Sequence, residues 1–106
     1  MNARMKLAAL VSLTIFTLVP AIAQSPGADT YKAKCQGCHG AAGMADTSVG
    51  KIFKVLPVND PSVKKMTEPA MIDAVKNGMG KMQAFKDKLT DEQIKGAVEY
   101  FRTLGK

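Results

Sequence analysis

The clearest hydrophobic pattern in the chain lies close to its C-terminus. Apolar residues recur there at helical spacing, and one face consists of Ile94, Ala97, Phe101 and Leu104. Thr90 stands three residues before Gln93, as in a capping box that begins a helix, and Gly105 is a typical helix stop. The pattern predicts a helix over residues 91–104.

Two further helices are predicted upstream. Thr67 is a good N-cap residue and Pro69 suits a first turn, so a helix is expected to continue from there to Asn77. Residues 30–38 are expected to form another helix, capped by Asp29. The chain is therefore predicted to be all-α, with three to four helices.

The segments between these helices are long and contain several Gly and Pro residues. Residues 40–60 and 78–89 are predicted to be loops, and residues 62–66 a single short helical turn. Residues 51–56 fit both a helical turn and an extended stretch. Loops of this length are uncommon in a compact domain unless they have a function, such as enclosing a cofactor.

The first 23 residues have the pattern of a secretory signal peptide. Arg4 and Lys6 give a positive start, residues 7–19 are uncharged, and residues 21–23 form an A-x-A cleavage site. The alternative is an uncleaved membrane anchor, but this apolar stretch is short against the roughly 20 residues that a spanning helix needs. We expect cleavage that leaves a periplasmic domain of residues 24–106, with no stable membrane insertion.

A short motif at the end of the first predicted helix carries the most specific chemistry. Cys35, Cys38 and His39 form a C-x-x-C-H motif, the signature of covalent c-type haem attachment. One helical turn brings the two thiols to neighbouring edges of the ring, where each adds to a vinyl group. The imidazole that follows is a standard proximal ligand of haem iron. One haem c, bound through Cys35 and Cys38, is therefore expected, with His39 as its proximal ligand.

Two other kinds of site use a C-x-x-C motif. A thioredoxin-like redox pair needs a strand–helix–strand context, and the hydrophobic pattern predicts none. A closed structural zinc site needs four ligands, whereas the chain has only two cysteines and one histidine, His39. Both alternatives are disfavoured.

The charge of the chain bears on its partners. The net charge of +6 falls to +4 without Arg4 and Lys6. No basic run has interleaved aromatic residues, so nucleic acid is not an expected partner. Lysines can instead form a face that steers an acidic redox protein, or simply a solvated surface. The candidate docking charges are Lys81, Lys86 and Lys88.

Together these features resemble the class I c-type cytochromes, especially the small bacterial monohaem and cytochrome c6-like proteins. The resemblance covers residues 27–104. Besides the haem motif, the segment from Gly80 to Phe85 looks like the family's ligand loop, and that from Ala97 to Leu104 looks like its last helix. The resemblance implies a class I cytochrome c fold, in which helices and long loops wrap one covalently attached haem.

The resemblance also implies a set of site residues. The family ligates the iron opposite the histidine through a methionine sulfur, and Met82 matches that position. Met79 is a competing ligand, and Gln83 stands where the family usually has proline. The implied cofactor-binding residues are Cys35, Cys38, His39 and Met82, of which His39 and Met82 ligate the iron. The other methionines of the mature domain, expected to fill the core, are Met44, Met66 and Met71.

Two further contacts follow from the same resemblance. Tyr100 is similar to the family's aromatic residue that packs the last helix across the first, against a face formed by Gly27 and Tyr31. A glycine at such a crossing allows close approach of the other helix. Pro57 is similar to the proline whose carbonyl accepts the second N–H of the ligating histidine.

The function implied by the resemblance is electron transfer. We expect a monomeric periplasmic carrier, not an enzyme, that shuttles single electrons through a His/Met-ligated haem between membrane or periplasmic redox partners. One alternative is a haem subunit of a larger dehydrogenase or oxidase. Another is a five-coordinate haem sensor or peroxidase, which is disfavoured because a peroxidase usually needs a distal histidine and His39 is the only histidine.

Overall fold

The computed structural model describes residues 9–16 and 25–106. The second of these ranges contains six helices: α1 (Pro26–Lys34), α2 (Gln36–His39), α3 (Ser48–Ile52), α4 (Pro61–Lys64), α5 (Glu68–Asn77) and α6 (Asp91–Leu104). The only β-structure among the described residues is an isolated bridge between Met79 and Met82. The prediction of an all-α fold is confirmed, but the expected number of three to four helices is too low. α3 lies within the predicted loop 40–60, and the first predicted helix is divided into α1 and α2.

The N-terminal segment adds little to this architecture. Residues 9–16 form neither helix nor strand. Most of the predicted signal peptide, residues 1–8 and 17–23, lies outside the described part of the chain. No helix within the described ranges is long and apolar enough to cross a membrane.

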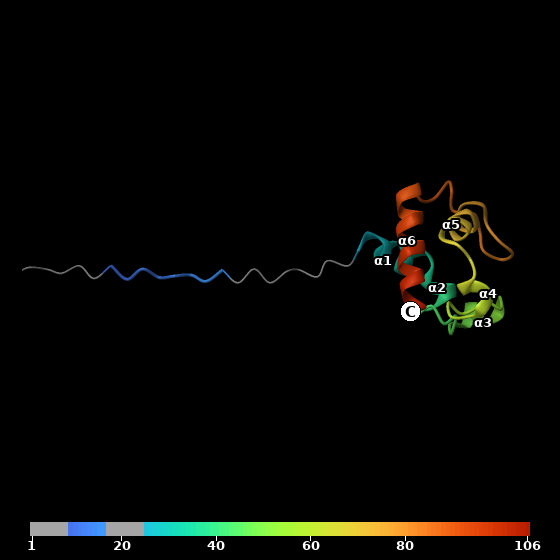
Figure 1. Cartoon of the computed structure of the whole chain (residues 1–106), viewed down its shortest axis with the longest axis horizontal. Helices are drawn as coiled ribbons and strands as arrows, with labels where there is room; N and C mark the ends of the chain where they lie inside the picture. The colour runs from blue at the N-terminus through green and yellow to red at the C-terminus, as the bar shows by residue number, and fades with distance from the viewer. Residues whose placement is uncertain (1–8, 17–24) are drawn as a thin grey trace, which may run out of the picture.

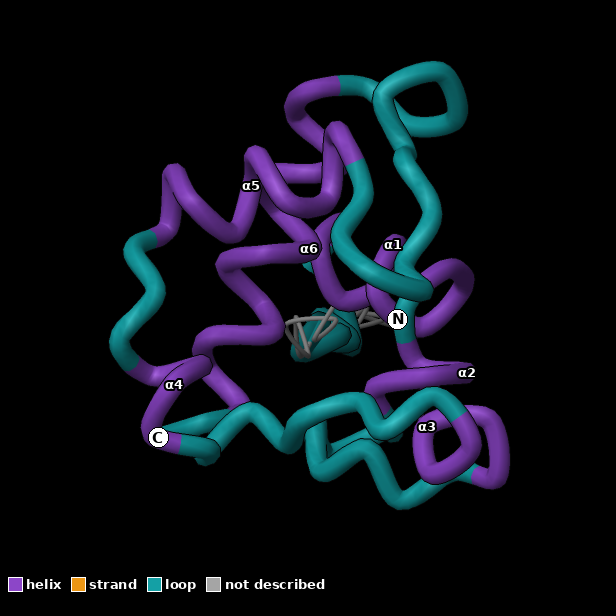
Figure 2. The backbone as a smooth tube through the Cα atoms, turned by 90° about the vertical axis from the view of Figure 1, so that its right-hand side faces the viewer, coloured by secondary structure: helices purple, strands orange, loops and turns teal. Residues whose placement is uncertain are grey.

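Helix α6 is the element around which the others are arranged (Figure 1). α1 crosses it, and α5 lies beside its N-terminal half. α4 lies near its C-terminal end, whereas α2 and α3 lie together on another side of the molecule, as Figure 2 shows. The segment 78–89, which contains the predicted ligand loop, connects α5 to the N-terminal end of α6.

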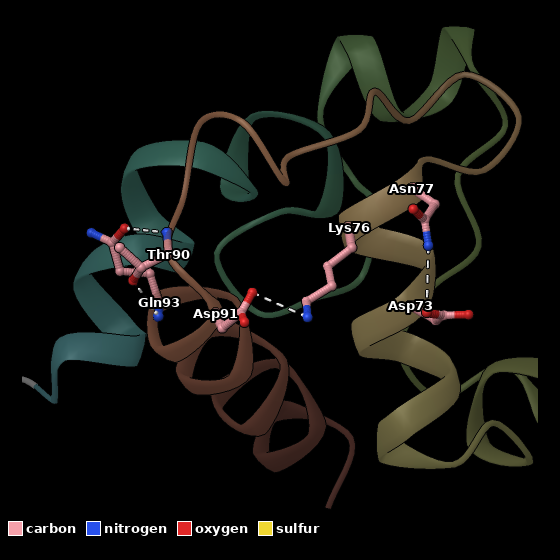
Figure 3. A network of polar contacts seen from close by, with 6 residues as sticks. All are labelled: Asp73, Lys76, Asn77, Thr90, Asp91 and Gln93. Atoms are coloured by element: carbon pink, nitrogen blue, oxygen red, sulfur yellow. Dashed lines mark hydrogen bonds and ion pairs between the residues drawn. The ribbon is translucent and has the colours of Figure 1, made fainter.

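The start of α6 is held by the predicted capping box (Figure 3). The Gln93 backbone N–H donates to Thr90 Oγ1 at 3.2 Å, and the Thr90 backbone N–H donates to Gln93 Oε1 at 2.9 Å. At the residue after Thr90, Lys76 Nζ lies 3.1 Å from Asp91 Oδ1 and joins α5 to α6. The carboxylate of this ion pair is exposed and the lysine partly so, so its contribution to stability is small, about 0.2–1 kcal/mol.

The helix predicted after Thr67 is also confirmed. Thr67 Oγ1 accepts a hydrogen bond from the Ala70 backbone N–H at 3.3 Å, and α5 ends at Gly78, whose φ is +83°. In the segment 51–56, for which the sequence fits two conformations, α3 ends at Ile52, a turn follows at residues 53 and 54, and residues 55 and 56 have no regular secondary structure.

The predicted boundaries of the first helix are wrong. α1 begins at Pro26 because Ser25 is its N-cap, with Ser25 Oγ accepting from the Ala28 backbone N–H at 3.2 Å. A serine followed by proline is a stronger start signal than the Asp29 that was expected to cap the helix. The helix then breaks at Cys35, whose φ of −115° separates α1 from α2.

The hydrophobic core lies between α5, α6 and the loop that connects them. Its buried members are Met71, Phe85, Leu89, Ile94 and Val98. Met66, Met82 and Phe101 are partly buried and pack against this cluster. Met66 and Met71 therefore fill the core as expected, whereas the prediction for Met44 is wrong, because its side chain is 43% exposed.

The crossing of α1 and α6 brings two backbones into contact. A Cβ atom on Gly27 would lie 2.2 Å from the carbonyl oxygen of Gly96, and one on Gly96 would lie 3.2 Å from Gly27 Cα. Beside this point the rings of Tyr31 and Tyr100 pack with their centroids 5.3 Å apart. The predicted crossing at Gly27, Tyr31 and Tyr100 is confirmed.

Tyr31 also ties this crossing to the segment that follows the C-x-x-C-H motif. Its ring is 2% exposed, and its hydroxyl donates to the carbonyl oxygen of Gly40 at 2.6 Å. Burial, with the nearby Cys35, holds the pKa of the Tyr31 hydroxyl well above its usual range. The group is therefore a protonated donor at neutral pH.

Gly27→Ala is expected to destabilise the protein by about 2–3 kcal/mol, because the new methyl group would meet backbone that cannot move aside. Gly96→Ala is the matched control, since its Cβ atom would need a shift of only a few tenths of an ångström. Urea unfolding of both variants, followed by circular dichroism, tests this order. Equal losses would show that the backbones are not in close contact.

Tyr31→Phe is expected to lower the free energy of unfolding by about 1 kcal/mol, because a buried hydrogen bond to the Gly40 carbonyl is lost. The comparison is Tyr100→Phe, whose hydroxyl donates to no residue of the described chain and whose loss should be near zero. The same urea unfolding experiment measures both. A loss for Tyr100→Phe as large as that for Tyr31→Phe would contradict the assignment.

Candidate haem-binding site

The C-x-x-C-H motif forms one tight turn at the junction of α1 and α2. The backbone N–H groups of Cys38 and His39 both donate to the Cys35 carbonyl oxygen, at 3.2 and 3.0 Å. Both cysteines are partly buried, and neither forms a disulfide. This geometry presents two free thiols and one imidazole from a single turn, as in the c-type haem attachment motif.

Contacts from two sides fix the conformation of this turn. Thr47, the N-cap of α3, donates its hydroxyl to the Gly37 carbonyl oxygen at 2.7 Å. On the other side the Tyr31 hydroxyl holds the carbonyl of Gly40, which leaves α2 with a φ of +83°. The turn is therefore anchored to both α1 and α3.

Burial shifts the pKa of two side chains that the motif supplies, Cys35 and His39. It raises the pKa of the Cys35 thiol to about 11, with a smaller effect of the neighbouring Cys38. It lowers the pKa of the His39 imidazole below its ordinary value. His39 is therefore neutral at pH 7, which is the form that binds a metal.

The imidazole of His39 has an unusual environment. Its Nδ1 atom is buried and has no hydrogen-bond partner. Its ring packs edge-on against Phe101, with the centroids 5.2 Å apart. No hydrogen bond between described residues involves either ring nitrogen, so a nitrogen of this neutral imidazole is available to a metal. Beside two free thiols, such an imidazole fits a haem site, where one ring nitrogen binds the iron.

The contact expected between Pro57 and His39 is not formed. The carbonyl oxygen of Pro57 accepts from the Asp60 backbone N–H at 2.9 Å and closes a local turn. The next residue, Val58, donates its backbone N–H to Gly43 at 2.7 Å. These two bonds give the segment a conformation that does not supply the acceptor for the imidazole.

The two candidate methionines lie at the ends of one tight turn. The backbone N–H of Met79 donates to the Met82 carbonyl at 3.1 Å, and that of Met82 donates to Met79 at 2.9 Å, with Gly80 at a φ of +56°. Met82 packs against the core cluster, whereas Met79 is 59% exposed. Phe101, which contacts His39, packs against the same cluster, so both proposed iron ligands border it.

Within residues 9–16 and 25–106, no three or more His, Cys, Asp or Glu side chains gather in a way that could hold a metal ion.

Three residues of the site environment were not predicted from the sequence. Gly96 makes the α1–α6 crossing, Thr47 anchors the haem-binding turn, and Phe101 packs on His39. The sequence pattern placed Phe101 on the apolar face of α6 but carried no signal for its contact with the imidazole. Thr47 carried a weak signal, because it is a good N-cap residue within a loop-like segment.

Comparisons with known proteins agree with this site. The family described as cytochrome C oxidase, cbb3-type, subunit III matches residues 23–101. Cytochrome c6 of Bryopsis maxima is 34% identical over 79 residues, which cover 70% of this chain and 83% of that protein. Cytochrome c6 of Leptolyngbya boryana is 36% identical over 76 residues, covering 70% of this chain and 84% of that protein.

A solved structure shows the same fold. The c-type cytochrome KustC0563 superposes with a TM-score of 0.68 at 29% identity, covering 76% of this chain and 98% of that one. The expected class I cytochrome c fold is thereby confirmed. The cytochrome c6 relatives and the match over most of the domain also confirm haem c as the cofactor and electron transport as the role. The chain is thus a c-type cytochrome of the family described as cytochrome C oxidase, cbb3-type, subunit III, similar to cytochromes c6, and it carries haem c on Cys35 and Cys38.

Proposed function

We propose that this protein is a periplasmic carrier of single electrons, in which His39 and Met82 ligate the iron of the haem attached to Cys35 and Cys38. The observation that carries the proposal is the haem-binding turn, where two free thiols lie beside a neutral, partly buried imidazole whose Nδ1 atom has no hydrogen-bond partner in the described chain. The haem supplies a one-electron iron centre. The chain supplies its ligands, its orientation and an apolar surrounding.

The packing of the two methionines supports Met82 as the second ligand. A methionine side chain that already packs against the core has little conformational freedom left to lose when its sulfur binds the iron. An exposed methionine would lose more side-chain entropy on binding. Met82 packs against the core, whereas Met79 is exposed. A sulfur ligand raises the reduction potential, which favours the ferrous state and so the uptake of an electron from a donor.

Gln83 departs from the family's proline, and the structure offers it a different restraint. Its side-chain oxygen Oε1 accepts a hydrogen bond from Lys88 Nζ across the loop. This bond is exposed, so its contribution to stability is modest. It nevertheless links Gln83, the residue after the proposed ligand Met82, to Lys88 near the start of α6.

The lysines of the ligand loop are the proposed docking charges. Lys81, Lys86 and Lys88 are all exposed. Exposed charges of one sign steer a partner of the opposite sign and raise its association rate. The proposed partner at this end of the molecule is therefore an acidic redox protein.

The periplasmic location rests on the N-terminal sequence. We infer that residues 1–23 act as a signal peptide, because a charged start, an uncharged stretch and an A-x-A site follow one another. Mass spectrometry of the exported protein tests this, and the expected mature chain begins at Gln24.

A second candidate function is that of a haem subunit in a larger oxidase or dehydrogenase. It is favoured by the description of the matching family, which names an oxidase subunit. Purification from native membranes under mild conditions discriminates the two functions. A freestanding carrier should elute alone, whereas a subunit should elute with a larger enzyme.

Met82→Ala is expected to abolish the weak red absorption band that sulfur ligation gives to the oxidised protein, and to lower the reduction potential. Met79→Ala is the matched control and should leave both unchanged, because its side chain is exposed. Absorption spectra of the haem-loaded variants measure this. If only Met79→Ala loses the band, Met79 is the ligand.

Replacement of Lys81, Lys86 and Lys88 by glutamate is expected to slow oxidation of the reduced protein by ferricyanide about tenfold at low salt, since an anionic reagent would then be repelled. The control carries the same change of net charge at Lys32, Lys34 and Lys106. Stopped-flow rates at several salt concentrations test the idea. Equal rates for the two triple variants would rule out a local docking face.

A further inference from the structure

A continuous series of aromatic contacts leads from His39 to the surface of the molecule. The His39 ring contacts Phe101 at 5.2 Å between centroids, and Phe101 stacks on Tyr31 at 6.0 Å with an interplanar angle of 23°. Tyr31 in turn contacts Tyr100 at 5.3 Å. Tyr31 is buried, whereas Tyr100 is only partly buried, so the series begins at the proposed iron ligand and ends at solvent.

A groove opens where this series ends. It has a volume of about 530 Å³ and lies between the start of α1 and the adjoining side of α6. Its lining includes Pro26, Gln93 and the ring of Tyr100. The groove is therefore a preformed concave surface with an aromatic ring in its wall.

The charge of the groove is acidic. The charged residues in its lining are Glu92 and Glu99. Lys95 Nζ lies 3.9 Å from Glu99 Oε1 and offsets part of its charge. Two carboxylates and one ammonium leave this face with a net charge of −1. The face thus differs in sign from the lysine-bearing ligand loop.

We propose that this groove is a second docking site, for a redox partner that presents a cationic and aromatic surface, and that an electron passes between that partner and the haem along Phe101, Tyr31 and Tyr100. The proposal rests on the proposed electron-carrier function. The ferrous haem would be oxidised to the ferric state, and the partner would be reduced by one electron. The three rings are in contact with one another and keep their oxidation state, so no proton is released or taken up.

Two faces of opposite charge allow the carrier to distinguish its donor from its acceptor. An acidic protein is attracted to Lys81, Lys86 and Lys88 and repelled by the groove, and a cationic protein behaves in the opposite way. Each partner then docks without competing for the other's surface. A single docking face would require one partner to leave before the next could bind.

The first experiment maps the site without using electron transfer. The mature haem protein, in its reduced diamagnetic form, is titrated with hexaamminechromium(III), a redox-inert paramagnetic cation, and followed by NMR. Broadening is expected at the amides around Glu92, Glu99 and the start of α1. It should fall at least about threefold in the double variant Glu92→Gln/Glu99→Gln. The charge-matched control is Glu68→Gln/Asp87→Asn, which should broaden like the parent protein.

The second experiment measures electron transfer at the two faces. Tris(phenanthroline)cobalt(III), a cationic aromatic oxidant, takes one electron and becomes cobalt(II), and ferricyanide is its anionic counterpart. Glu92→Gln/Glu99→Gln and Tyr100→Leu are both expected to slow the cobalt reaction at least about threefold at low salt. Tyr100→Leu should leave the ferricyanide reaction unchanged, and Tyr100→Phe, which keeps the ring, should behave like the parent in both.

The outcomes separate this proposal from the one on which it rests. Broadening that is spread evenly over the surface, or a cobalt reaction that is equally fast in Tyr100→Leu, would overturn the second docking site. A parent protein that reacts with neither oxidant would instead contradict the electron-carrier function. Groove-centred broadening together with a slowed cobalt reaction in both groove variants supports the proposal.

Discussion

The contact between the backbones of Gly27 and Gly96 is the constraint on which the rest of this structure depends. With no side chain on either residue, α1 and α6 approach closely enough for Tyr31 to be buried between them. The hydroxyl of that buried ring then holds the residue that follows His39. The position of the haem-binding turn therefore depends on the close helix crossing, because one hydrogen bond from the buried Tyr31 joins the two.

Local signals in the sequence were sufficient to predict the helices whose N-caps are formed by residues close in sequence. The Thr90–Gln93 capping box and the Thr67 N-cap depend on residues three positions apart, so their geometry can be inferred without the fold. The start of α1 was missed because two competing local signals stand close together, and the Ser25-Pro26 pair is the stronger one. The C-x-x-C-H motif was recognised for the same reason, since all its chemistry lies within one turn.

Features that depend on distant parts of the chain could not be read in this way. The sequence around Gly96 carries no sign of its close contact with Gly27, because that contact depends on how α1 packs against α6. The expected contact of Pro57 with His39 failed because the conformation of that loop is set by bonds to Asp60 and, through Val58, to Gly43. The partner of the imidazole is instead an aromatic ring from α6, on a helix more than half the domain away in sequence.

The α1–α6 crossing also has a consequence for how the chain folds. Small helical proteins usually fold fast because most of their contacts are local, and the entropy of closing long loops slows those whose contacts are not. Here the contact that completes the structure joins the first helix to the last. The loss of chain entropy on bringing them together precedes most of the gain from packing, so this domain should fold more slowly than its size and helix content suggest.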